Sequence, residues 1–151
     1  MKSKQVLDVQ QMQHLQELGL DTSNASMLYC DLCDEEYILV ESKHRFDKEE
    51  NAILLEGVRI SVIYCKKVTP AYTLQDVLDA LPKEIMYENK RCWASIDLED
   101  GFIGYYYENY SLYYKWAYFE AVMKDESIID AAYELLVWCI ENKFVETNKN
   151  E

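Results

Sequence analysis

The sequence predicts an α+β fold with a mainly antiparallel sheet of short strands and hairpins and about three helices. Segments with helical periodicity occur near the start, in the middle and at the end, and short β-prone runs lie between them. Half of the 151 residues are hydrophobic, with only 4 Gly and 2 Pro, which is typical of a packed globular body. We see no repeat and no dividing linker, so we expect a single domain over residues 1–151, frayed at 1–4 and 147–151.

The first predicted helix runs from about Val9 to Leu18, with apolar residues on one half of its circumference. Asp8 precedes it as an N-cap, and Gln11 three residues later completes a capping-box pattern. Gly19 supplies the C-terminal stop. This pattern indicates an amphipathic surface helix.

A group of β-prone runs follows, separated by turn-forming and acidic residues. The last two of these runs are expected to pivot at Gly57. We expect strands at Met27–Cys30, Tyr37–Glu41, Ala52–Glu56 and Val58–Cys65, and an exposed charged loop at Ser42–Asn51.

A second helix is predicted at Leu74–Leu81, after a turn at Thr69–Pro70. Thr73 is the expected cap, and Asp76 lies in the first turn, where the helix dipole favours a negative charge. Pro82 ends the helix because proline cannot continue it.

The third part of the chain reads as strands joined by tight turns. Asp100–Gly101 is a strong hairpin signal. The predicted strands are Ile85–Tyr87, Cys92–Leu98, Phe102–Glu108 and Leu112–Phe119, with Glu108–Ser111 turning the chain back before the last of them.

The final predicted helix, about Ile128–Asn142, is apolar over most of its surface. Ser127 and Asp130 form a capping-box-like pair at its start. Its polar stripe is narrow and contains Asp130, Glu134 and Glu141. Such a helix is buried on more than one side or covers a partner subunit, and we favour burial in its own core.

Charge and cysteine content limit the partners and the location that we expect for this protein. The formal net charge is −13, which repels phosphate backbones and anionic membranes, so we expect no direct nucleic-acid partner and no membrane. The acidity favours solubility or a basic partner. A special case of the second possibility is an acidic inhibitor that mimics DNA and occupies a basic protein. No apolar run follows Met1–Lys4, and Ala131–Ile140 is too short to span a bilayer. Five cysteines at irregular spacing favour reduced thiols and a cytoplasmic location.

Three segments carry a resemblance. They are KQVLDVQQMQHLQELGLDTSNAS (Lys4–Ser26), TPAYTLQDVLDALPKEI (Thr69–Ile85) and DESIIDAAYELLVWCIENKFVETNK (Asp125–Lys149), somewhat under half of the chain. These segments resemble short uncharacterised proteins of gut Bacteroides-type bacteria and their prophages. The resemblance implies a bacterial origin, with a mobile element as one source, and a cytoplasmic setting. It implies no activity, ligand or catalytic residue.

Sulfur and imidazole groups give weak signals for chemistry. Cys30 and Cys33 form a CxxC, but the acidic neighbours disfavour a thiolate and no second CxxC completes a zinc site. His44 and Cys65 match no familiar finger spacing as additional ligands. His14 lies on the polar face of the first helix, and we expect both histidines to be solvated.

The carboxylates near the Asp100–Gly101 turn could be imagined as an acid–base pair or a cation site. Asp97 and Glu99 share one side of a strand, but the oxygen ligands of a calcium loop are absent, so we interpret them as turn residues. Phosphate-loop, nucleophile-elbow and HExxH motifs are absent as well. We therefore assign no catalytic, cofactor-binding or metal-binding residue, and we lean against an enzyme.

Tyrosine crowding is the unusual feature of the sequence. In a hairpin, Tyr105 and Tyr107 share one face and Tyr106 the other, so one core cannot bury all of the ring-bearing residues of this segment. Exposed tyrosines suit protein interfaces because they provide large contact area at low entropy cost. The predicted interaction residues are Tyr105, Tyr106, Tyr107, Tyr110, Tyr113, Tyr114 and Trp116 of the hairpin, with Val137 and Trp138 of the last helix.

These observations favour a non-enzymatic domain that binds another protein or itself. The alternative is a small ligand-binding domain or enzyme with a tyrosine-lined pocket, near Cys92 or Asp97.

Overall fold

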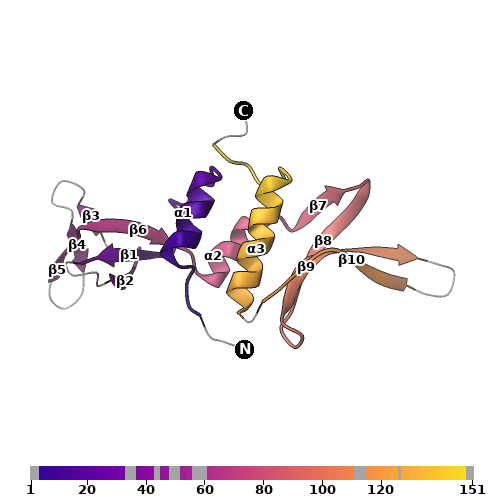
Figure 1. Ribbon diagram of the computed structural model, residues 1–151, viewed down its shortest axis with the longest axis horizontal. Helices are drawn as coiled ribbons and strands as arrows, with labels where there is room; N and C mark the ends of the chain where they lie inside the picture. The colour runs from indigo at the N-terminus through magenta and orange to yellow at the C-terminus, as the bar shows by residue number, and fades with distance from the viewer. Residues whose placement is uncertain are drawn as a thin grey trace.

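The computed structural model describes residues 4–32, 37–42, 45–47, 52–55, 61–110, 115–125 and 127–148. Residues 45–47, 54–55, 61, 109–110 and 115–122 are described by their backbone alone. The predicted α+β class is confirmed: in the described part of the chain, three helices lie between two groups of antiparallel strands (Figure 1). The outer parts of the expected frayed ends, residues 1–3 and 149–151, lie outside the described residues.

Helix α1 (Val9–Glu17) forms as the capping pattern predicts. Asp8 accepts a hydrogen bond from the Gln11 backbone at 2.8 Å, and the Gln11 side chain accepts one from the Asp8 backbone at 3.0 Å. Gly19 ends the helix with a positive φ of 93°, a conformation that costs glycine little. The Gly19 carbonyl then accepts a hydrogen bond from the Asn148 backbone at 2.8 Å, which joins the end of α1 to the C-terminal end of the described chain.

Strands β1 to β6 form two small sheets at one end of the molecule (Figure 1). One sheet has the order β2-β1-β6 and the other β3-β4-β5, and all of the pairs are antiparallel. The strands are β1 (Met27–Asp31), β2 (Tyr37–Glu41), β3 (Arg45–Asp47), β4 (Ala52–Leu55), β5 (Ser61–Tyr64) and β6 (Lys67–Ala71).

Two predictions in this region are wrong. Residues Arg45–Asp47 of the expected loop form β3, because pairing with β4 supplies the backbone partners that local sequence did not indicate. The expected turn at Thr69–Pro70 is part of β6. Pro70 is tolerated there because β6 is an edge strand, where a missing N–H breaks no ladder. The expected pivot at Gly57 lies outside the described residues.

Helix α2 (Leu74–Ala80) confirms the predicted cap. Thr73 and Asp76 form a reciprocal capping box, and the helix ends before Pro82. Asp76 also accepts hydrogen bonds from the Ser26 hydroxyl at 2.6 Å and from the Ser26 backbone at 2.9 Å. This one carboxylate therefore ties the start of α2 to the residue that precedes β1.

The second half of the chain forms a curled four-stranded sheet in the order β10-β9-β8-β7. The β8–β9 hairpin confirms the Asp100–Gly101 signal, and Gly101 has a φ of 72°. The final hairpin turns later than predicted, since β9 continues through the expected turn at Glu108–Ser111 as far as Tyr110. The strands are β7 (Glu84–Tyr87), β8 (Lys90–Asp97), β9 (Phe102–Tyr110) and β10 (Lys115–Lys124).

Helix α3 (Ile128–Glu141) lies against the inner face of this sheet and buries most of its apolar residues in the chain's own core, as expected. The predicted capping pair is wrong, because Ser127 makes no side-chain cap hydrogen bond. Asp130 instead accepts hydrogen bonds from Lys4 and from the Gln11 side chain, both at 2.8 Å. These long-range contacts direct the carboxylate toward the chain's N-terminal segment.

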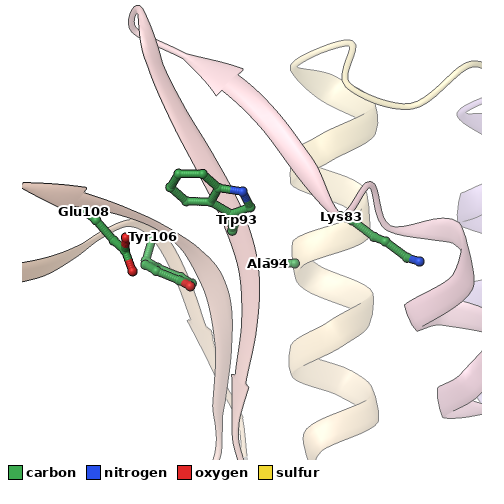
Figure 2. Close-up of a pocket in the computed structure, with 5 residues that line it drawn as sticks. All are labelled: Lys83, Trp93, Ala94, Tyr106 and Glu108. Carbon is green, nitrogen blue, oxygen red and sulfur yellow. The ribbon is translucent and has the colours of Figure 1, made fainter.

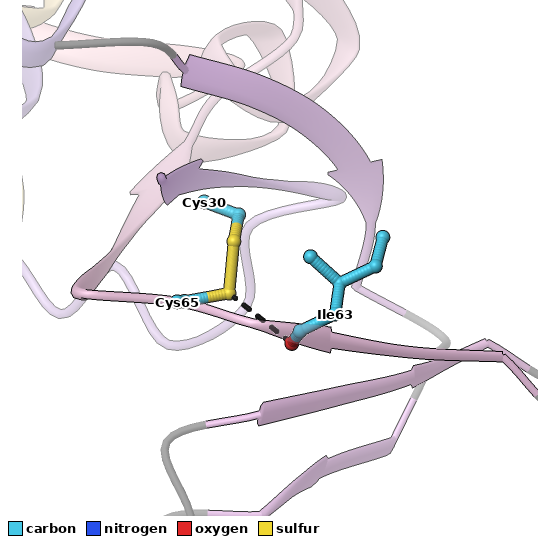
Figure 3. The surroundings of a disulfide bond; sticks show 3 residues. All are labelled: Cys30, Ile63 and Cys65. Atoms are coloured by element: carbon cyan, nitrogen blue, oxygen red, sulfur yellow. Dashed lines mark hydrogen bonds between the residues drawn. A yellow bond between two sulfur atoms is a disulfide. The ribbon is translucent and has the colours of Figure 1, made fainter. Parts of the chain in front are cut away.

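A second, smaller core lies in the β1–β6 region and is joined by a disulfide (Figure 3). Cys30 of β1 is bonded to Cys65, which lies between β5 and β6, and both are packed with Ile53. The expectation of reduced thiols is therefore wrong for these two cysteines. The carbonyl oxygen of Ile63 lies 3.7 Å from the Cys65 sulfur. Cys33 lies outside the described residues.

Candidate functional site

Trp93 and Tyr106 form an aromatic pair on the outer face of the β7–β10 sheet. Trp93 of β8 is directly opposite Tyr106 of β9, so the two side chains lie on the same face. Their ring centroids are 6.0 Å apart and the rings are tilted by 43°. Both side chains are half-buried. The pair therefore presents aromatic surface to the outside while each ring supports the other.

Charged and apolar residues of β7 and β8 lie beside the aromatic pair. The Arg91 guanidinium lies 5.8 Å from the Trp93 ring centroid, a cation–π distance, and its Nη2 donates to Glu84 at 2.9 Å. The hydrogen bonds from Arg91 hold the pKa of the Glu84 carboxyl below its ordinary value. Met86 is opposite Arg91 and is 60% exposed. We call Glu84, Met86, Arg91, Trp93, Tyr106 and Glu108 the outer aromatic face.

A hollow of about 470 Å³ opens beside this face. It is lined by Lys83, Trp93, Ala94, Tyr106 and Glu108. Figure 2 shows Trp93, Tyr106 and Glu108 on adjoining strands, with Lys83 on the far side of Ala94. The hollow has the volume of a small-ligand site and combines two aromatic rings with one cation and one carboxylate.

The opposite face of the same sheet is covered in part, since Ile96 on that face is 39% exposed. Among the described elements, α3 packs on the inner face through β9 and β10, and that face contributes Ile85, Cys92, Ile103 and Tyr105 to the core. Trp93 and Tyr106 alternate with the buried Cys92 and Tyr105, so the outer aromatic face is on the side of the sheet turned away from α3.

The tyrosines of β9 divide between the two faces as the alternation predicts. Tyr105 is fully buried, and its hydroxyl donates to the Pro82 carbonyl oxygen at 2.6 Å. Tyr107 is half-buried against the core, with the Lys90 ammonium 4.6 Å from its ring centroid. Because Tyr105 has no exposed surface, a partner could contact only its neighbours. Tyr113 and Tyr114 lie outside the described residues, as do the side chains of Tyr110 and Trp116.

The other predicted interaction residues lie on the partly exposed side of α3. Val137 and Trp138 are half-buried and pack against the main core. Trp138 contacts Tyr87 at a centroid distance of 5.3 Å and Phe144 at 5.5 Å. The predicted interaction residues thus belong to two separate surfaces, the β9 strand and α3.

Sequence reasoning did not select Trp93, Arg91 or Met86. The sequence did contain a signal for Trp93. Depending on the length of the turn between β8 and β9, the residue opposite Trp93 is Tyr106 or Glu108, and in either case the two lie on one face of the sheet. Arg91 and Met86 meet across the β7–β8 hairpin. This hairpin turns at Glu88 and Asn89, which both have positive φ.

The remaining candidates for chemistry do not assemble into a site. The Asp97 carboxylate accepts the backbone N–H groups of Glu99 and Asp100 at 3.0 and 2.9 Å, which confirms the turn interpretation. In the described part of the chain, no group of three or more His, Cys, Asp and Glu could hold a metal ion. Among the helices that the structure describes, none has the length and apolar character required to cross a membrane.

The prediction of a solvated histidine is wrong for His14. Its Nδ1 lies 2.6 Å from the Tyr133 hydroxyl, and the two rings meet edge to face. His44 lies outside the described residues. His14 thus packs α1 against α3, an arrangement that the polar face of an isolated helix could not reveal.

The chain matches no protein-family model, no curated protein and no solved structure. The resemblance to proteins of gut Bacteroides-type bacteria and their prophages therefore stays a prediction.

Proposed function

We propose that this protein is a non-enzymatic binding protein and that a protein partner docks on the outer aromatic face. The observation that carries this proposal is the composition of the face. Trp93, Tyr106 and Arg91 are adjacent there, and these are the three residue types that dominate binding hot spots. Exposed Met86 extends the same surface, and methionine is also enriched at interfaces.

The geometry of the face supports a preformed contact surface. Tilted aromatic packing and the Arg91–Glu84 ion pair restrict the side chains before a partner arrives, which lowers the entropy cost of binding. The salt bridge lies at the border of the aromatic pair, where it contributes orientation more than affinity. The partner is either a different protein or a second copy of this chain.

Sedimentation and affinity capture test the proposal together. The variants are Trp93→Ala and Tyr106→Ser, with Tyr64→Ser as a matched control because Tyr64 is 67% exposed on the distant strand β5. We expect wild type and Tyr64→Ser to self-associate, or to retain the same purified partner, and the other two variants to bind at least about ten-fold more weakly.

The test requires that the captured partner be purified and its affinity measured directly. A protein that is monomeric at all concentrations, with a partner affinity that Trp93→Ala and Tyr106→Ser leave unchanged, would contradict the proposal. Far-UV circular dichroism of each variant separates loss of binding from loss of fold.

A second candidate function is the binding of a small molecule, and the hollow of about 470 Å³ favours it. Trp93 and Tyr106 would stack on a ring, while Lys83 and Glu108 would orient polar groups. A thermal-shift screen with sugars, nucleotides and metal salts tests this candidate. A stabilising compound whose effect disappears in Trp93→Ala supports it, and the absence of any shift removes it.

The Cys30–Cys65 disulfide bears on the setting of this binding activity. Disulfides persist in oxidising compartments and are rare in the cytosol. We therefore infer that the protein acts in an oxidising environment, in place of the cytoplasm expected from cysteine spacing. To test this inference, free thiols are alkylated in the native cells before the protein is isolated. The oxidation state of both cysteines is then mapped.

A further inference from the structure

A separate hollow of about 340 Å³ lies over the outward side of α3. It is lined by His14 of α1, by Met123 of β10 and by residues of α3, of which Glu134 and Glu141 are acidic. The apolar residues are Met123, Tyr133, Val137 and Trp138. We call this hollow the α3 groove. It shares no lining residue with the outer aromatic face.

Contacts with neighbouring elements hold the floor of the groove in place. Tyr133 is held by His14 of α1 at 2.6 Å, and Trp138 is packed between Tyr87 and Phe144. The floor is therefore preformed, and a ligand that binds there pays little for ordering it.

The acids of the groove are spaced along one line of the helix. Glu134 and Glu141 are exposed and seven residues apart, so they lie two turns and about 10 Å from each other. Val137 lies between them on the same side. Within the described residues, neither carboxylate forms an ion pair with a lysine or arginine.

Negative charge accumulates around Glu134. Burial and the nearby carboxylates of Asp125 and Asp130 raise the pKa of Glu134. A cation placed at this point would relieve repulsion as well as gain attraction.

Another acid of α3 is paired with a lysine from a different part of the chain. Asp130 accepts a hydrogen bond from the Lys4 ammonium at 2.8 Å, although the two residues are far apart in sequence. A lysine from another segment thus pairs with the first acid of the stripe, while Glu134 and Glu141 remain available to a second molecule.

We infer that the α3 groove binds a basic amphipathic helix of a partner protein, with an apolar side chain over Val137 and lysine or arginine residues at Glu134 and Glu141. Helices dock in apolar grooves through residues at such spacings, and the complementary charges fix their register. A second copy of this chain is a poor occupant, because a symmetric contact would set these carboxylates against their own counterparts in a protein of net charge −13.

A synthetic peptide tests this inference with the full-length protein. The probe is a fluorescent helical peptide that has two lysines seven residues apart and a leucine between them, and its partner peptide has glutamates in place of the lysines. Fluorescence anisotropy measures both affinities. We expect the lysine peptide to bind and the glutamate peptide to show no saturable binding.

Two variants locate the binding, and a third controls for net charge. Glu134→Gln with Glu141→Gln is expected to weaken the lysine peptide about five-fold, the effect of two exposed ion pairs. Val137→Thr is expected to weaken it about five-fold, since it replaces a methyl group of the apolar floor with a hydroxyl. Glu88→Gln with Glu99→Gln removes the same charge from exposed turns and should change the affinity by less than about two-fold.

Three results would overturn the inference. They are equal weakening by the two charge-matched double variants, saturable binding of the glutamate peptide, and a concentration-dependent dimer that Val137→Thr abolishes. The first would mean diffuse attraction, and the third a contact between copies. Trp93→Ala should leave peptide binding unchanged, so this experiment and the test of the outer aromatic face can fail independently.

Discussion

Tyr105 and Cys139 meet inside the core, where the cysteine Sγ lies 3.7 Å from the tyrosine hydroxyl oxygen and donates to it. The same hydroxyl donates to the Pro82 carbonyl oxygen, so one side chain of β9 connects α3 with the chain just after α2. Its neighbour Tyr106 faces the other way, toward Trp93. Adjacent tyrosines of one strand therefore have different tasks, one in the core and one on the surface.

Replacing these two tyrosines by phenylalanine separates the tasks. Tyr105→Phe should lower the free energy of unfolding by about 1–2 kcal/mol, because it removes the hydrogen bond to Pro82. Tyr106→Phe should change it by less than about 0.5 kcal/mol, the usual size of a surface substitution. Urea unfolding measures both. Equal effects of the two substitutions would be inconsistent with the opposite placement of the rings.

Reducing the disulfide should loosen the small core in preference to the main one. A cross-link across 35 residues stabilises the folded state by about 3–4 kcal/mol in the chain-entropy model. Cys30→Ser with Cys65→Ser, or added reductant, should therefore lower the melting temperature. Hydrogen exchange should quicken in β1 and β6 and change little in α3. Uniform loss of protection across the chain would argue that the two cores unfold as one unit.

Asp76 should make the protein sensitive to acid. Burial alone would raise its pKa, but hydrogen bonds from Ser26 and Thr73 outweigh that effect and hold the pKa below its ordinary value of 3.8. A lowered folded-state pKa contributes stability that is present above pH 3.8 and is lost as the pH falls through the folded pKa. Stability measured from pH 6 down to pH 2 should therefore decline more steeply in wild type than in Asp76→Asn.

The same substitution has a matched control on the same helix. Asp76→Asn should cost about 2–3 kcal/mol near neutral pH, because an amide cannot accept all of the hydrogen bonds that the carboxylate accepts. Asp79 is exposed and bonded only locally to Gln75, so Asp79→Asn should cost less than about 0.5 kcal/mol. If both variants behave alike, the link between Ser26 and α2 does not stabilise the fold.

The Cys139 thiol should be inert in the native protein. It is fully buried, and burial raises its pKa to about 11, so at pH 8 it is protonated and inaccessible. Alkylation with iodoacetamide followed by mass mapping should leave Cys139 unmodified in buffer and modified in urea. Rapid labelling of Cys139 without urea would mean that α3 opens from the sheet.

Local sequence predicted much of the element structure, and each success has a local cause. The caps at Asp8 and Thr73 satisfy their own helix starts within three residues, so the chain nearby contains all of the information. The burial of α3 also follows from composition, because an almost wholly apolar helix must be covered. The same reasoning failed at Ser127, where Asp130 turns to Lys4, a residue that no local pattern connects to it.

The candidate site was predicted only in part. Strand alternation correctly divided Tyr105 from Tyr106, but the partner of Tyr106 depended on the exact turn. A two-residue turn at Asp100–Gly101 would pair Glu99 with Phe102, whereas Asp97 caps a longer turn and pairs with Phe102 itself. That difference shifts the register by two residues and sets Trp93 opposite Tyr106.

By itself, the sequence determined the α+β class, the helices with their local caps and the alternation of faces along each strand, because these depend on residues within a few positions of one another. The tertiary structure alone decided the Cys30–Cys65 bond, the strand at Arg45–Asp47, the contact of His14 with Tyr133 and the meeting of Trp93 with Tyr106. Each of these joins segments that only the folded chain brings together, through long-range contacts that compete with local preference and prevail.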